Sequence, residues 1–132
     1  MIYTICFCDS EPHLFKPLLK RGFSHCFAIK HTDDNYIVVN SDNSHIEIDA
    51  LPVTPFVYAD LVDGMTRITL AIKVDSKQSM AGLRWLSCVE SVKSLLGINA
   101  PLLLTPYQLY KRLLRCRGKV QQNAPQNNNG QQ

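Results

Sequence analysis

The chain has 132 residues, of which 45% are hydrophobic and 19% charged, with a net charge of +3. This length and composition are typical of one globular domain that buries its core without disulfides. No apolar run approaches the roughly 20 residues of a membrane span, and the N-terminal stretch lacks the basic segment of a signal peptide. We therefore expect neither a membrane protein nor a secreted one.

The sequence contains an odd number of cysteines. They are Cys6, Cys8, Cys26, Cys88 and Cys116. Without a secretory signal, an odd count predicts free thiols in a reducing compartment. Cys6 and Cys8 are two residues apart and should lie on the same side of a strand. A single C-x-C pair with scattered histidines is a poor match to a zinc site, so we expect no metal and no other cofactor.

The first 75 residues are predicted to be mostly extended. Residues 3–8 indicate a first strand or an apolar edge, and residues 11–22 predict a short helix that Pro17 makes irregular and Gly22 ends. The alternation of apolar and polar residues then predicts a hairpin over 24–40 with its loop at 31–34, a strand over 44–51 that the stretch LPVTP breaks, and a strand over 66–75 with Ile68, Leu70, Ile72 and Val74 on one face.

Two capped helices follow. In the first, Ser87 is the expected N-cap, Glu90 completes a capping box, and Gly97 suits the position after the last turn. In the second, Thr105 is the expected N-cap and Pro106 takes the first helical position. Their apolar stripes are Val89, Val92, Leu95 and Leu96 in the first, and Leu109, Leu113 and Leu114 in the second. Together these elements predict an α+β fold, with an antiparallel sheet packed against helices.

The C-terminal end has a different composition. Residues 120–132 carry no charge and few apolar side chains. Such a segment cannot bury enough surface to offset its ordering entropy, so it is predicted to be a disordered polar tail. The folded domain should therefore span residues 1–119.

A basic run precedes this tail. It consists of Lys111, Arg112, Arg115, Arg117 and Lys119. The simpler interpretation is a solvated helix end, where cations also suit the helix dipole. The alternative is a contact with nucleic acid or phosphate. We favour the first, because no aromatic residues alternate with the basic ones.

Cys88 would be the first residue of the helix that Ser87 caps. Its sulfur would then lie near unsatisfied backbone N–H groups and the positive end of the helix dipole, which favour the nucleophilic thiolate. Taken alone, this position favours a buried structural cysteine, because free cysteine is among the most buried residue types. A catalytic role also needs a base within hydrogen-bond reach.

The predicted hairpin offers such a base. If residues 31–34 form the loop, Lys30 pairs with Asn35 and His25 faces Asn40, with Cβ atoms about 5 Å apart. An asparagine can hold one imidazole nitrogen and leave the other directed at a thiol, as in a Cys-His-Asn triad. A slip of one residue would put the two side chains on opposite faces.

Other interpretations of these residues stay open. His25 could begin a strand facing solvent, and Asn40 could be a turn residue before the stretch that follows it. Three further histidines compete as the base, and we rank His31, expected at a loop tip, and His45, expected on an exposed face, below His25. The three are His13, His31 and His45.

Several stretches resemble a known family. GFSHCFAI, a second strand ending in a polar residue, and then CVESVKSLLGI and LLLTPYQLYKRLL are similar to small phage-encoded proteins that look like circularly permuted papain-like, NlpC-like cysteine hydrolases. In that group the histidine precedes the cysteine, as His25 precedes Cys88 here. The resemblance covers roughly residues 22–115. It implies Cys88 as nucleophile, His25 as general base and Asn40 as orienting residue. The stretch NSD departs from the family, whose third position is often acidic or followed by proline.

Two functions follow from these observations. The first is a cysteine hydrolase or acyltransferase acting on peptide, peptidoglycan or other acyl substrates. The alternative is a non-catalytic virion or head-tail protein that binds other virion proteins through a papain-like scaffold. Either would work in the cytoplasm of a bacterial host or in the virion.

Overall fold

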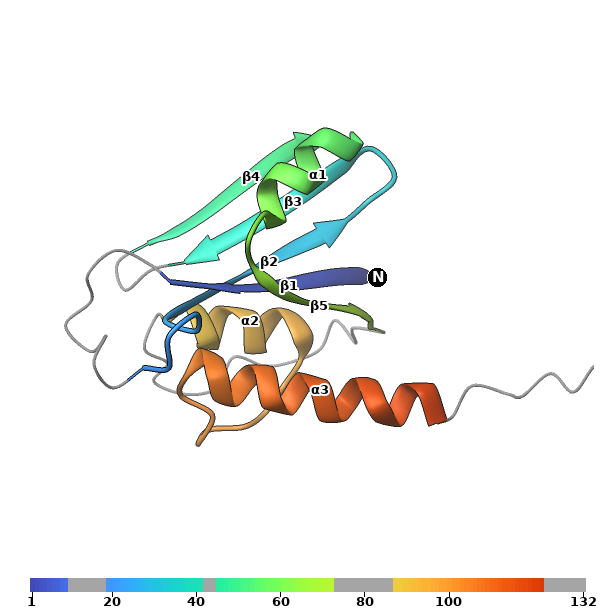
Figure 1. Ribbon diagram of the computed structural model, residues 1–132. Helices are drawn as coiled ribbons and strands as arrows, with labels where there is room; N and C mark the ends of the chain where they lie inside the picture. The colour runs from blue at the N-terminus through green and yellow to red at the C-terminus, as the bar shows by residue number, and fades with distance from the viewer. Residues whose placement is uncertain (10–18, 42–44, 73–86, 123–132) are drawn as a thin grey trace, which may run out of the picture.

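The computed structural model describes residues 1–9, 19–41, 45–72 and 87–122, with side chains up to residue 117. Figure 1 shows the arrangement of its elements, which are β1 (Ile2–Cys8), β2 (His25–His31), β3 (Asn35–Ser41), β4 (Ile46–Pro52), α1 (Pro55–Val62), β5 (Thr66–Ala71), α2 (Cys88–Leu96) and α3 (Pro106–Gln122).

The five strands form one antiparallel sheet in the order β4-β3-β2-β1-β5. Helices α2 and α3 pack on one face and α1 on the other (Figure 1). The predicted α+β fold with an antiparallel sheet against helices is therefore confirmed. None of the described helices combines the length and apolarity that a membrane crossing requires.

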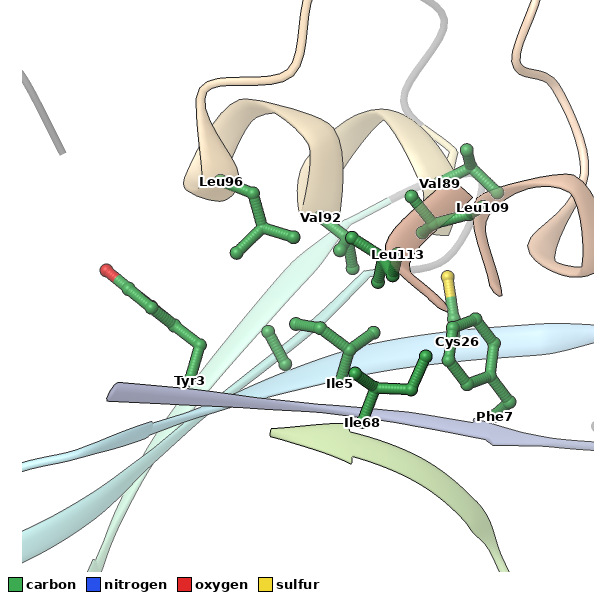
Figure 2. Packing of buried hydrophobic residues seen from close by; sticks show 11 residues of the cluster. Tyr3, Ile5, Phe7, Cys26, Ile68, Val89, Val92, Leu96, Leu109 and Leu113 are labelled. Carbon is green, nitrogen blue, oxygen red and sulfur yellow. The ribbon is translucent and has the colours of Figure 1, made fainter. Parts of the chain in front are cut away.

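Strand β1, which lies between β2 and β5, is buried on both faces, because helices cover both sides of the sheet there. Tyr3, Ile5 and Phe7 point toward α2 and α3, whereas Cys6 points toward α1. Figure 2 shows the larger cluster, in which the strand residues meet Val89, Val92 and Leu96 of α2 and Leu109 and Leu113 of α3. Truncating a fully buried leucine such as Leu109 to alanine costs about 2–5 kcal/mol. This core fixes α2 over β2.

The helix caps follow the sequence expectations. The Ser87 hydroxyl accepts a hydrogen bond from the backbone N–H of Glu90 at 3.1 Å, and Gly97 adopts φ 67° at the C-terminal end of α2. At the start of α3, the backbone N–H of Gln108 donates to Thr105 Oγ1 at 3.3 Å, and Thr105 N–H donates to Gln108 Oε1 at 3.1 Å. Both helices therefore begin where their caps predict.

Helix α1 was not expected from the sequence. The stretch LPVTP predicts only a break in the strand, but the same residues start a helix. Thr54 caps it by accepting a hydrogen bond from Val57 N–H at 3.2 Å, and Pro55 occupies its first position. Proline suits that position because its missing N–H would have no partner there.

Smaller differences lie at the ends of elements. Leu114 was expected on the buried face of α3 but is exposed, and α3 continues to Gln122, past the expected end of the domain near residue 119. Most of the helix expected over 11–22 lies outside the described residues; Lys20 to Phe23 form a turn, in which Phe23 N–H donates to Lys20 O at 2.9 Å. Residues 73–75 of the expected last strand and the tail from 123 also lie outside the described residues.

Candidate active site

One end of the molecule gathers the predicted site residues. His25 is the first residue of β2, Cys88 is the first residue of α2, and Cys8 ends β1 directly opposite His25. Asn40 is the second-last residue of β3. In Figure 1 the start of β2, the start of α2 and the end of β1 lie at the same end of the sheet. Because these residues are at the ends of strands and of a helix, their polar side chains can lie close together without interrupting the packing of the core.

His25 is held by Asn40. The ring Nε2 lies 2.7 Å from Asn40 Oδ1. An amide oxygen can only accept a hydrogen bond, so Nε2 carries a proton and donates it. The other ring nitrogen, Nδ1, is then the one that meets a neighbour on the far side of the ring.

The register that brings these two residues together differs from the expected one. Ile29 pairs with Val38 and His31 with Tyr36, so the pairing is displaced by two residues from the expected Lys30–Asn35 hairpin. The cause lies in the loop: the Thr32 hydroxyl donates to Asn35 O at 2.7 Å and accepts from Asn35 N–H at 2.9 Å, which closes the turn one residue later. A two-residue displacement preserves the faces of the strands, and Asn40 reaches His25 diagonally rather than directly.

The Cys88 thiol has a strongly perturbed pKa. Its pKa falls from the ordinary 9.0 to about 4 because the Cys26 side chain donates a hydrogen bond to the sulfur, assisted by hydrogen bonds from His25 and the Cys26 backbone and by the positive charge of His25, against an opposing effect of burial. Because His25 Nε2 is engaged by Asn40, the hydrogen bond to Cys88 falls to Nδ1. Cys88 is therefore a thiolate near neutral pH, which is the nucleophilic form.

Cys26 is the site residue that sequence reasoning missed. It is fully buried, and its pKa rises well above the ordinary value because its thiol is hydrogen-bonded to Cys88 and because it is buried. The signal in the sequence was its place next to His25: successive residues of a strand point to opposite faces, so Cys26 faces α2 when His25 does not. Recognising it required knowing which face α2 covers.

The remaining cysteines are different. Burial raises the pKa of Cys6 to about 12. The pKa of Cys8 is raised too, by burial first and then by the charges of Asp9 and Cys88, although Cys8 pairs with His25 across the sheet. Cys116 is exposed on α3. Cys88 is thus the cysteine whose surroundings favour the thiolate, and no metal-binding group of three or more such ligands is found in the part of the chain that the structure describes.

The segment before His25 is fixed by Asp9. Its Oδ1 accepts from Gly22 N–H at 2.8 Å and from the Ser24 hydroxyl at 3.2 Å. Gly22 adopts φ 83°, a conformation that favours glycine. Ser24 is buried, so the approach to His25 is an ordered turn tied to the end of β1 rather than a solvent-facing strand start.

Two of the competing histidines lie elsewhere. His31 binds Thr4 on the α1 side of the sheet, and His45 is exposed beside Glu47. His13 lies outside the described residues. The described side chains of the basic run, Lys111, Arg112, Arg115 and Arg117, are exposed on α3, which fits a solvated helix face; Lys119 has no described side chain.

Comparison with known proteins adds nothing to this geometry. The chain matches no protein-family model, no curated protein and no solved structure. The chemistry of the site must therefore be argued from its own residues.

Proposed function

We propose that the protein is a cysteine hydrolase or acyltransferase, with Cys88 as nucleophile, His25 as general acid and base, and Asn40 as the residue that orients His25. The observation that carries the proposal is the combination of two contacts on one imidazole. Asn40 holds Nε2 at 2.7 Å, and the same ring hydrogen-bonds a thiol whose pKa is lowered to about 4. A thiolate, a base and an orienting group in this arrangement are the parts of a covalent acyl-transfer mechanism.

The reaction would run in two steps. The Cys88 thiolate forms a bond to the carbonyl carbon of the substrate, and the displaced electron pair moves to the carbonyl oxygen. When the bond to the leaving group breaks, His25 gives its proton to the leaving nitrogen, oxygen or sulfur. Water then attacks the thioester, His25 takes its proton, and Cys88 leaves as thiolate with release of the acid; an acceptor other than water gives acyl transfer.

Helix α2 supplies stabilisation for the developing oxyanion. Cys88 is its first residue, so the Cys88 backbone N–H is among those without a partner in the helix. It lies next to the sulfur and at the positive end of the helix dipole. A donor placed there is worth about 2.7–4 kcal/mol in related chemistry.

The order of the site residues supports a permuted papain-like relationship as part of this proposal. His25 precedes Cys88, and Asn40 takes the third position, as in the resemblance described above. On that relationship, peptides, peptidoglycan peptides and acyl esters or thioesters are the substrates to test first. A scaffold in a virion is the remaining alternative, and it requires that Cys88 have no nucleophilic role.

The decisive experiment is the pH profile of iodoacetamide alkylation, mapped to each cysteine by mass spectrometry. Lowering the thiol pKa from 9.0 to about 4 raises the thiolate fraction at pH 5 by about four orders of magnitude. It lowers the intrinsic nucleophilicity of the sulfur by about two to two and a half orders, so the net advantage in alkylation rate at pH 5 is about thirtyfold to a hundredfold. We expect Cys88 alkylation to be flat from about pH 5 to 8, and exposed Cys116 serves as the reference thiol on the same chain.

Two variants complete this test. Cys88→Ser should abolish the pH-5 signal and Cys116→Ser should leave it intact. Incubation with p-nitrophenyl acetate should add one acetyl group to Cys88 in the parent protein. An alkylation profile for Cys88 that follows that of Cys116 would remove the hydrolase proposal and leave the scaffold.

A further inference from the structure

Two adjacent residues of β3 contact the two halves of the proposed site. Asn40 binds His25 on one face of the sheet. Ser41, next in the chain, points to the opposite face, where α2 lies. Its Oγ is 2.6 Å from Ser91 Oγ and 3.5 Å from the Ser87 carbonyl oxygen. The base and the nucleophile's helix are therefore tied to consecutive residues of one strand.

Ser41 binds the turn that carries Cys88. Ser87 precedes Cys88, and Ser91 follows it by three residues; the backbone N–H of Ser91 also donates to Ser87 O at 3.0 Å, closing that first turn. Ser41 is only 3% exposed. If its hydrogen bond to α2 were broken, water could not readily take the place of the lost partner. The hydrogen-bond contacts of this serine with the first turn of α2 explain its burial better than the apolar packing around it does.

Hydrophobic packing alone does not define the position of this turn. Val89, Val92 and Leu96 attach α2 to the sheet, but the hydrophobic effect has no direction and tolerates a small sliding of the helix along the strands. The hydrogen bonds of Ser41 have a direction and a fixed length. They are the polar contacts described between β3 and the first turn of α2.

We propose that Ser41 is a positioning residue, which sets the distance between the Cys88 sulfur and His25 by fixing the first turn of α2 to the strand that orients His25. This inference rests on the proposed function. Strand β3 contacts both His25, through Asn40, and the first turn of α2, through Ser41. A displacement of α2 along the sheet would separate the Cys88 sulfur from the His25 imidazole, and the Ser41 contacts oppose that displacement. A misplacement of about 1 Å in such a site can cost about a hundredfold in rate.

The test compares Ser41→Ala, Ser91→Ala and the double variant with Thr54→Ala. Thr54 caps α1 on the other face of the sheet through one hydroxyl hydrogen bond. Thr54→Ala is thus a matched control, since it also deletes a single structural hydroxyl but lies away from Cys88. Ser91→Ala removes the other end of the same contact at a half-buried position, and it gives the answer should Ser41→Ala fold poorly.

The main readout is the apparent pKa of Cys88 from iodoacetamide alkylation, with p-nitrophenyl acetate turnover beside it. We expect Ser41→Ala and Ser91→Ala each to raise that pKa by at least one unit and to lower kcat about tenfold or more with little change in KM. The double variant should resemble the single variants, because the short Ser41–Ser91 hydrogen bond is lost in all three. Thr54→Ala should lower Tm and leave both the alkylation profile and kcat unchanged.

The outcomes separate the two proposals. A parent protein in which Cys88 titrates as an ordinary thiol contradicts the hydrolase itself. A parent with a low Cys88 pKa, together with serine variants whose profiles match Thr54→Ala, keeps the hydrolase and rejects Ser41 as a positioning residue.

Discussion

Two histidines of this sheet each contact a hydroxyl or thiol, yet their surroundings lead to different chemistry. His25 lies at a strand end between Asn40 and Cys88. His31 lies on the α1 side, with Nε2 at 2.8 Å from Thr4 Oγ1. On a list of residue types, a Thr-His pair looks as much like an activated nucleophile as a Cys-His pair does.

The two pairs differ in the charge and the unused hydrogen-bonding capacity of the nucleophilic atom. Thr4 is fully buried, and besides His31 its hydroxyl meets Tyr58 Oη at 3.2 Å and Thr69 Oγ1 at 2.9 Å. A hydroxyl has one proton and two lone pairs, so three partners saturate it. Burial also lowers the pKa of His31 and favours its neutral form. This cluster joins β1, β2, β5 and α1, and its role is structural.

At Cys88 the same kinds of contact have the opposite effect. The hydrogen bonds from Cys26 and His25 stabilise the charged form of the sulfur, and they outweigh the burial that would raise its pKa. A charged atom at a helix start can react, whereas a saturated neutral hydroxyl cannot. The comparison predicts that a reactive pair is identified by the charge and the free lone pairs of its nucleophilic atom, and not by the presence of a histidine.

The largest predicted contrast comes from replacing each histidine. His25→Ala should reduce acyl-transfer activity by about 10²–10⁴-fold, because it removes the general acid and base, and should raise the Cys88 pKa by removing a hydrogen bond and a positive charge. His31→Ala should leave the alkylation profile of Cys88 in place and lower stability only. Equal loss of activity in both variants, with both folded by circular dichroism, would break the comparison.

The second contrast concerns Cys26. Its hydrogen bond makes the largest contribution to the low pKa of Cys88, and a hydrogen bond to a charged group is worth about 1.5–3 kcal/mol, or about 1–2 pKa units. Cys26→Ala should therefore shift the alkylation profile of Cys88 upward by about that amount. Cys26→Ser keeps a donor of similar size and should shift it less. Identical profiles for the two variants would contradict the role of the Cys26 thiol.

The third contrast is smaller. Asn40→Ala should leave the fold intact and lower activity by about tenfold, because a hydrogen bond from the charged imidazole is worth at least about 1.5 kcal/mol. Its effect should appear in kcat, since an imidazole free to rotate transfers protons less well, and the alkylation of Cys88 should change little. A loss confined to KM would place Asn40 in substrate binding instead of orientation.

Local chemistry explains what the sequence predicted well. The caps at Ser87 and Thr105 were predictable because an N-cap depends on residues within one turn. The same-face relation of His25 and Asn40 also survived an error in register, since a displacement of two residues leaves every side chain on its face. These features need little knowledge of the rest of the chain.

Features that depend on tertiary packing were not predictable in the same way. Pro55 can stop a strand or start a helix, and the choice of α1 depends on the apolar surface that Val38 and Phe27 leave to be covered. The partnership of Cys26 with Cys88 depends on which face α2 packs against. The buried role of Ser41 requires both the end of β3 and the first turn of α2.

The smallest expected effect on activity is at Thr4, and it tests the structural half of the comparison. Thr4→Val keeps the shape of the side chain and removes a hydroxyl that contacts three partners. His31 and Thr69 can turn to water at their partly exposed positions, so the expected cost is about 1–2 kcal/mol, or a fall of about 4–8 °C in Tm for a domain of this size. Acyl-transfer activity and the Cys88 alkylation profile, measured well below that Tm, should equal those of the parent protein. Thr4→Ser keeps the hydroxyl and should recover much of the lost stability. A Thr4→Val protein that is as stable as the parent but has lost activity would reverse the assignment, because the hydroxyl would then serve the reaction and not the fold.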